Sequence, residues 1–163
     1  MENKTIAFEI IAVLLLIGST LAVIFLSNQD NSELVKNLQF NSLLRESHNA
    51  LAQKQEKVIK SSAEWADLWT EMFPTEQIAP AVNFDEKMLI AVFQGQKPSG
   101  RYSIEINKIK EYADYIEVTV RETSPGENCI VTFALTSPLH IVEVEKSDKP
   151  IRFTFEQEIT RCN

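Results

Sequence analysis

The clearest pattern in the chain is a change of hydrophobic period between residues 88 and 106. Met88–Phe93 is an unbroken apolar run bounded by turn residues and too short to cross a membrane. Such a run is typical of a strand buried on both faces. After a polar loop, Tyr102, Ile104 and Ile106 alternate with polar residues, which indicates a half-buried strand. The simplest arrangement is a long-looped hairpin at the centre of an antiparallel sheet.

One amphipathic helix is predicted over Ser61–Met72. Its apolar positions recur at i, i+3, i+4 and i+7 and include Trp65 and Trp69, which is the spacing of a single buried stripe. Ser61 and Glu64 form a capping-box pattern at its start, and a proline follows its end. Two tryptophans one turn apart could stack a ligand, but this spacing favours packing against the sheet.

The remaining apolar segments predict further short strands and no alternation of strand and helix. After Ile106 the alternation loses its phase, which indicates a β-bulge near Asn107–Lys108. The fold class is therefore α+β: a mainly antiparallel β-sheet domain of about seven strands with one principal amphipathic helix, preceded by a single N-terminal transmembrane helix. The other predicted strands are Phe40–Leu44, Glu56–Lys60, Val82–Phe84, Ile116–Val120, Ile130–Leu135, Leu139–Val144 and a last one around Phe153 and Phe155.

The first part of the chain is predicted to be a membrane anchor. Ile10–Leu26 carries no charge, and with the apolar residues before it the segment reaches the roughly 20 residues that span a bilayer. We divide the chain into an anchor over residues 1–26, a juxtamembrane linker over 27–38 and an extracytoplasmic α+β domain over 39–163.

A cleaved signal peptide is the alternative to a permanent anchor. Thr20 and Ala22 weakly resemble a cleavage site, but large apolar residues continue directly past them. Lys4 before the segment favours a cytoplasmic N-terminus with the domain outside the cell membrane.

Charge narrows the range of partners. The net charge is −7, and once the predicted anchor is set aside 15 basic and 21 acidic residues are left. This balance argues against nucleic acid and against tight binding to anionic lipid. The expected partners are the membrane, through the N-terminal helix, and a protein of unknown identity.

No stretch carries a catalytic, cofactor or metal signature. His48 and His140 are far in sequence from either cysteine, so a zinc site is not expected. His140, next to a predicted strand start, is expected to be exposed or half-buried. No nucleophile elbow, P-loop or dinucleotide fingerprint is present. We therefore expect a non-catalytic protein without a cofactor. Several carboxylates fall on the outward phase of predicted strands, where solvent contact is the default: Glu105, Glu117, Glu143, Glu145, Glu156 and Glu158.

The two cysteines of the chain are candidates for a disulfide. Cys129 and Cys162 would be oxidised in an extracytoplasmic location, and a bridge at the penultimate residue would hold a terminus that otherwise frays. Two free thiols are the alternative.

Several motifs together resemble the C-terminal domain family of PrcB, over roughly residues 56–146. The family is named for a subunit of a cell-surface protease complex. The resemblance implies a non-catalytic, extracytoplasmic, membrane-tethered domain that binds or assists a partner protein. Where the family pattern has a second glycine before a tyrosine, this chain has Arg101, and a left-handed backbone there would cost about 1 kcal/mol. The motifs are Glu64-Trp65, Leu68-Trp69, Val82–Phe84, Met88–Gly95, Gln96–Tyr102, Ser124–Gly126, Cys129, Thr136–Pro138 and the strand over Ile141–Val144.

Two functions follow, with a hydrolase as a distant third. The first is a membrane-anchored, non-catalytic interaction domain that supports a cell-surface protease or another envelope complex. The second is a small-ligand or peptide-binding domain that uses the loop over residues 94–102. This loop carries two cations on an acidic domain, and loops on rigid scaffolds are common recognition sites. Its candidate contact residues are Gln94, Gly95, Lys97, Pro98, Ser99, Gly100, Arg101 and Tyr102.

Overall fold

The computed structural model describes residues 33–75 and 78–162. The predicted anchor over residues 1–26 and most of the predicted linker lie outside the described residues. Within the described part, no helix has the length and hydrophobicity needed to cross a membrane.

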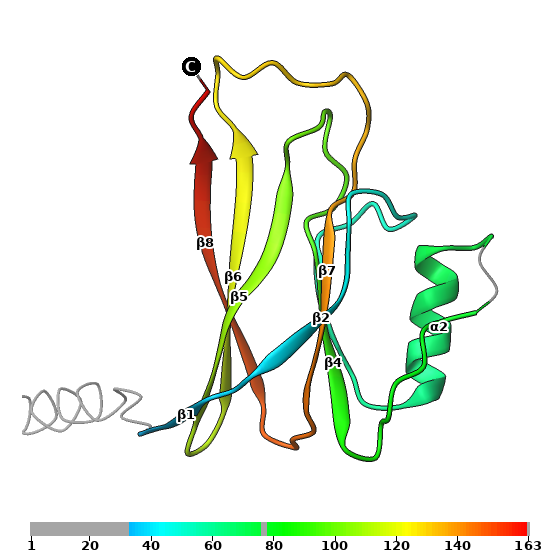
Figure 1. The fold of residues 1–163 in the computed structure, drawn as a ribbon, viewed down its shortest axis with the longest axis vertical. Helices are drawn as coiled ribbons and strands as arrows, with labels where there is room; N and C mark the ends of the chain where they lie inside the picture. The colour runs from blue at the N-terminus through cyan, green and yellow to red at the C-terminus, as the bar shows by residue number, and fades with distance from the viewer. Residues whose placement is uncertain (1–32, 76–77, 163) are drawn as a thin grey trace, which may run out of the picture. The chain divides into compact units, whose positions relative to one another are not determined.

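The domain is a sandwich of two four-stranded sheets with one helix (Figure 1). One sheet has the order β2-β7-β4-β3 and is called here the helix-side sheet. The other has the order β1-β5-β6-β8 and is called the open sheet. The elements are β1 (Leu34–Asn37), β2 (Phe40–Glu46), β3 (Gln55–Ile59), α2 (Ser62–Met72), β4 (Lys87–Phe93), β5 (Ser103–Tyr112), β6 (Ile116–Pro125), β7 (Leu139–Glu145) and β8 (Ile151–Thr160).

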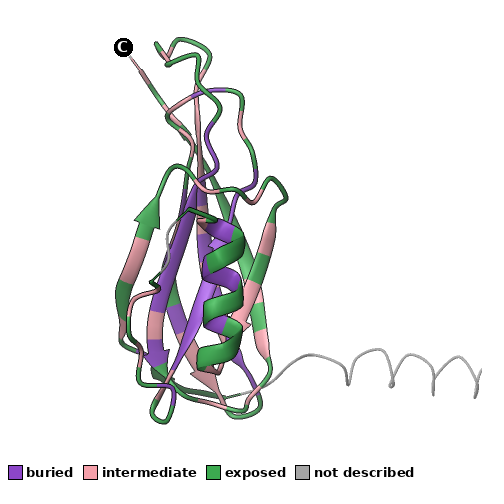
Figure 2. Ribbon diagram, turned by 90° about the vertical axis from the view of Figure 1, so that its right-hand side faces the viewer, coloured by how far each residue is buried: buried purple, intermediate pink, exposed green. Residues whose placement is uncertain are grey.

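Two hydrophobic cores hold these layers together. The first lies between the sheets, where Met88, Ile90 and Val92 of β4 meet the inward side chains of β5 and β6. The second lies between the helix-side sheet and α2, where the alternate β4 residues Leu89 and Phe93 meet the helix. Figure 2 shows α2 lying across the buried central strands of that sheet. An apolar run over all of β4 is thus required because both faces of the strand are covered.

The helix has the predicted face and cap. Trp65 and Trp69 are buried, their rings meet edge to face at 5.4 Å, and the Trp65 Nε1–H donates to the Pro80 carbonyl at 2.9 Å. The Ser61 hydroxyl accepts from the Glu64 N–H, and the Glu64 carboxylate accepts from the Ser61 N–H. The capping box and the packing role of the tryptophans are confirmed.

The predicted central hairpin is wrong, because its two strands belong to different sheets. β4 pairs with β3 and β7, whereas β5 pairs with β1 and β6. The loop over residues 94–102 therefore crosses between the sheets, and we call it the crossing loop. The two strands differ in period because one is covered on both faces and the other on a single face.

Two segments that were predicted to be strands do not form strands in the described part of the chain. Ile130–Leu135 lies in a long connection between β6 and β7, and Val82–Phe84 lies in a turn before β4. The apolar side chains that suggested the first strand are largely exposed, so their hydrophobicity does not reflect a place in the core.

Strand pairing at the start and the end of the domain also differs from the prediction. β1 begins at Leu34, inside the range assigned to the linker, because it completes the open sheet against β5. β8 pairs with β6 in parallel, whereas the other strand pairs are antiparallel. The predicted bulge is confirmed, since the register of β5 on β6 shifts between Ile106 and Lys108.

Candidate functional site

The crossing loop is fixed along its length by backbone hydrogen bonds. Lys97 exchanges two hydrogen bonds with Thr136, the Gln96 N–H donates to Ala52, and the Gly100 N–H donates to Thr132. The loop over residues 94–102 is therefore held against the connection over residues 126–138. We call that connection the apolar loop.

Two glycines of the crossing loop are required by close backbone approach. Gly95 has a φ of +74°, and a Cβ there would lie 2.8 Å from the Lys54 nitrogen. A Cβ on Gly100 would lie 2.4 Å from the Thr132 hydroxyl. Arg101 also adopts a left-handed φ of 69°, a conformation that costs a non-glycine residue about 1 kcal/mol.

The predicted contact residues divide into buried and exposed groups. Gln94 and Ser99 are buried and serve the loop itself. Lys97 is half-buried with its ammonium 5.7 Å from the Tyr102 ring centre. Pro98 and Arg101 are exposed. The structure therefore leaves mainly the two cations of this set near the surface.

The apolar loop exposes three large hydrophobic side chains. Ile130 is 88 % exposed, Phe133 99 % and Leu135 62 %. Water contact with side chains of this size is unfavourable, and exposed apolar groups gathered on one loop are typical of an interaction site. The sequence showed these residues only as a candidate strand, and their exposure was the missing information.

A disulfide anchors the apolar loop to the C-terminal end of the chain. Cys129 and Cys162 are bonded, with 5.0 Å between their Cα atoms, as predicted. The Gly126 N–H donates to the Thr160 carbonyl at 3.0 Å, and the Arg101 Nη1 lies 3.6 Å from the Cys162 sulfur. The bridge therefore joins the apolar loop, β8 and the crossing loop at one end of the sandwich, which we call the loop end.

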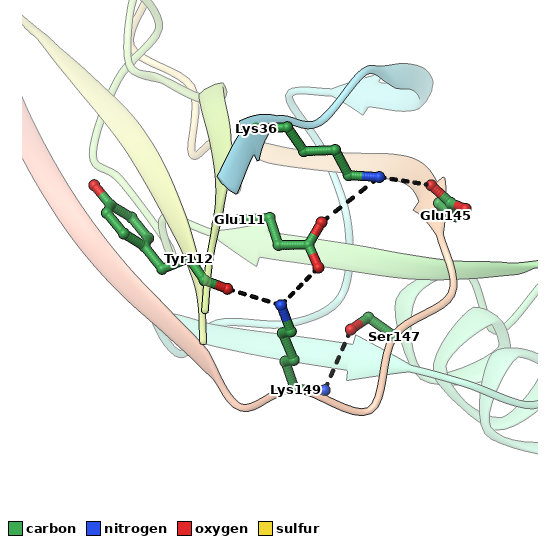
Figure 3. A network of polar contacts seen from close by, with 6 residues as sticks. All are labelled: Lys36, Glu111, Tyr112, Glu145, Ser147 and Lys149. Atoms are coloured by element: carbon green, nitrogen blue, oxygen red, sulfur yellow. Dashed lines mark hydrogen bonds and ion pairs between the residues drawn. The ribbon is translucent and has the colours of Figure 1, made fainter. Parts of the chain in front are cut away.

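A network of ion pairs lies at the opposite end of the sandwich, near Glu33, the first described residue (Figure 3). The Lys36 ammonium lies 3.6 Å from Glu111 and 3.5 Å from Glu145. The Lys149 ammonium lies 2.8 Å from the other oxygen of Glu111, and this contact is the main cause that lowers the pKa of Glu111.

A cleft of about 490 Å³ lies beside this network and is lined by Lys36, Leu38, Lys87, Glu145 and neighbouring residues. Acidic and basic side chains neutralise one another there. The crossing loop, which the ligand-binding hypothesis requires as a pocket mouth, takes no part in its wall.

His140 links the two sheets in the buried core, which corrects its predicted half-exposed position. Its Nδ1 accepts from the Ile106 N–H at 2.9 Å, and its Nε2 lies 2.9 Å from the Ser42 hydroxyl. Because Nδ1 accepts a hydrogen bond, the ring is neutral with its proton on Nε2. Burial, with a smaller contribution from Arg45, lowers the pKa of His140 to about 4.

A second polar group inside the sandwich was missed by the sequence analysis. The Glu122 carboxylate is buried and binds the Lys54 ammonium at 2.8 Å and the Gln157 amide at 2.6 Å. The same ammonium lies 4.0 Å from the Phe155 ring centre. The alternation of β6 could have identified this residue, since Glu122 falls on the same face of the strand as the buried Val118 and Val120. Its carboxylate oxygens contact Lys54 and Gln157 inside the domain.

Within the described ranges, no group of three or more His, Cys, Asp or Glu side chains is placed to hold a metal ion. The charged groups described above at the Glu33 end and at Glu122 are engaged with one another. The arrangement that is left for recognition is the loop end, with its exposed apolar side chains and two nearby cations.

Comparison with known proteins supports one family. Residues 88–145 match the PrcB C-terminal family. This segment runs from β4 through β7 and includes both the crossing loop and the apolar loop, so the resemblance is confirmed for the part of the chain that forms the loop end. No curated protein and no solved structure matches the chain.

Proposed function

We propose that this protein is a membrane-anchored, non-catalytic interaction domain whose loop end binds a partner protein in an extracytoplasmic complex. The observation that carries the proposal is the exposure of Ile130, Phe133 and Leu135 on a loop fixed by a disulfide. A rigid scaffold loses little conformational entropy on binding, so its exposed apolar side chains contribute efficiently to affinity.

The two loops lie at the opposite end of the domain from Glu33, the first described residue. The Ala113 N–H donates to the Glu33 carbonyl at the turn between β5 and β6, whereas both loops lie at the other end of these strands. Each strand has ten residues, or roughly 33 Å. The loop end is therefore separated by the length of the strands from the place where the chain enters the domain.

Charge defines the chemistry of this partner further. Lys97 and Arg101 lie beside the apolar loop on a chain whose net charge is negative. Their joint position favours a partner with an apolar centre and carboxylates at its rim. The family name supports a cell-surface protease complex as the setting.

The proposal is tested by capture of partner proteins from membranes with the full chain in mild detergent. A stoichiometric partner is expected with the wild-type chain and is expected to be lost with Ile130→Ser/Phe133→Ser. Ile78→Ser is the matched control, because Ile78 is 86 % exposed but lies outside both loops. Reversing both cations, with Lys97→Glu/Arg101→Glu, should weaken capture most at low salt.

Three results would contradict the proposal. They are the absence of any stoichiometric partner, equal capture by the loop variant and the Ile78→Ser control, and capture that does not depend on either cation at low salt. The melting temperature of each variant, expected to stay within a few degrees of wild type, separates loss of binding from loss of folding.

A further inference from the structure

The free edge of β8 is the longest unpaired strand edge among the described residues. β8 has ten residues and lies at the margin of the open sheet, with β6 on one side only. The other edge strands, β1, β2 and β3, are shorter, and β2 carries a register shift that disturbs its edge. β8 pairs with β6 without any shift and contains no proline. Bulges, prolines, short length and charged side chains protect edge strands. β8 lacks the first three, and its charged residues Arg152, Glu156 and Glu158 lie on the outer face of the sheet.

The hydrogen bonds to β6 determine which backbone groups of β8 face outward. The Ile116 N–H donates to the Pro150 carbonyl and the Gly126 N–H to the Thr160 carbonyl, so the even-numbered residues of β8 bond to β6. Because the backbone groups of successive strand residues point to opposite sides, the odd-numbered residues direct their N–H and C=O groups to the free edge. These residues are Ile151, Phe153, Phe155, Gln157 and Ile159.

The same residues place apolar side chains on the inner face of the sheet, beside the edge. Phe153 and Phe155 pair with Val118 and Val120 of β6. Phe155 is 37 % exposed and Ile159 67 %. A strand added here would meet unpaired backbone groups and partly exposed apolar side chains together, which are the two requirements of strand addition.

We propose that β8 accepts an extended segment of the partner protein as an additional strand, with apolar side chains on the inner face and basic side chains on the outer face. The outer face of β8 carries Arg152 near its start and Glu156 and Glu158 towards its C-terminal half, where Arg121 of β6 lies 3.5 Å from Glu158. Opposite charges across a strand pair are stabilising, so the C-terminal half of β8 favours basic side chains on the added strand. This inference rests on the proposed function, because it identifies the class of partner. The C-terminal end of β8 meets the apolar loop through the Gly126–Thr160 hydrogen bond, so β8 ends beside that loop.

A second copy of the chain is the alternative occupant of the edge. Two β8 strands paired antiparallel would join two open sheets into one sheet with two-fold symmetry. Self-association through β8 is an outcome that would overturn the proposal.

The test uses the full chain in mild detergent and a capped peptide of about eight alternating valine and lysine residues, the length of a typical strand. Amide hydrogen exchange is followed residue by residue. In the free chain, amides of the even-numbered β8 residues should be protected and those of Phe153, Phe155 and Gln157 should exchange quickly. With saturating peptide, the odd-numbered amides should slow by about tenfold or more. A valine–glutamate peptide is the charge control and should give a smaller effect.

The paired variants Phe155→Pro and Phe155→Ala separate the backbone edge from the side chain. Both lose the ring, but only proline removes the outward N–H. Peptide-dependent protection should persist in Phe155→Ala and disappear in Phe155→Pro. Equal protection in the two variants would overturn the proposal, as would protection at β2 or β3 instead, or odd-numbered amides already protected in the free chain.

Failure here is distinguishable from failure of the proposed function. If partner capture depends on Ile130 and Phe133 but not on the Phe155→Pro change, the loop end binds the partner and the β8 edge does not. If the capture of partner is lost with Phe155→Pro and kept with Phe155→Ala, the edge is part of the interface.

Discussion

The two sheets of this sandwich are protected to different degrees. The helix-side sheet has its central strands covered on both faces, by α2 on one and by the open sheet on the other. The open sheet is covered on its inner face alone, and its last strand, β8, has a free edge and partly exposed apolar side chains. The helix-side sheet contributes to both hydrophobic cores and therefore to the stability of the domain. The open sheet retains unsatisfied backbone and apolar groups, and these are the groups that a partner would use.

Removing the cover of the helix-side sheet should have the largest effect. Trp65→Ala deletes a buried ring that packs on Trp69 and bonds to Pro80, and the free energy of unfolding should fall by about 3–5 kcal/mol. Chemical denaturation measures the loss. A change below about 1 kcal/mol would show that the tryptophan is a surface residue and not a core residue.

Removing the disulfide at the loop end should cause the next largest loss of stability. The Cys129–Cys162 bridge closes a loop of 33 residues, for which the chain-entropy relation gives about 3–4 kcal/mol. The Cys129→Ala/Cys162→Ala variant should lose about this much stability and show faster exchange in β8 and the apolar loop. Two alkylatable thiols in freshly isolated, non-reduced protein would contradict the bridge.

The contact between the two sheets should respond to pH through His140. Its pKa is about 4 in the folded protein against an ordinary value of 6.5, so the unfolded chain binds the proton first as the pH falls. The contribution of the neutral His140 ring to the free energy of unfolding is complete above about pH 7. It is lost as the pH falls from 6.5 towards 4. Between pH 7 and 5 the loss is about 2 kcal/mol. His140→Gln should remove most of this dependence in denaturation curves, and an unchanged slope would contradict the neutral buried ring.

Relief of backbone strain at the crossing loop should have a smaller and opposite effect. Arg101 has a left-handed φ of 69°, so Arg101→Gly should raise the free energy of unfolding by up to about 1 kcal/mol. Thermal melting of the two proteins provides the measurement. A loss of stability would show that the Arg101 contact with the disulfide sulfur outweighs the strain.

The smallest effect is expected at the charge network of the Glu33 end. Lys36 is about half exposed, so solvent screens its contacts with Glu111 and Glu145, and Lys36→Ala should cost under about 1 kcal/mol. Added salt should reduce the difference between the two proteins further. A larger cost would mean that this network, and not the inter-sheet core alone, holds the sheets together.

The sequence by itself determined that the central strand and one face of the helix are buried, and where several elements begin. The unbroken run Met88–Phe93 required a strand covered on both faces, and the Ser61–Glu64 pattern defined the start of the helix. The loss of alternation after Ile106 located the bulge. These features follow from local periodicity and capping, which depend on residues close together in the chain. The resemblance to the PrcB C-terminal family was also visible in the residues themselves.

Only the tertiary structure decided which strands are neighbours and which apolar residues are left outside. A loop of the length of 94–102 can close a hairpin or cross between sheets, and alternation in β5 gives a buried face without naming the sheet that buries it. The parallel pairing of β6 with β8 joins segments separated by the whole of the apolar loop and β7. Ile130, Phe133 and His140 were misjudged for the same physical reason. Hydrophobicity is a property of one residue, whereas burial depends on what the rest of the fold places against it.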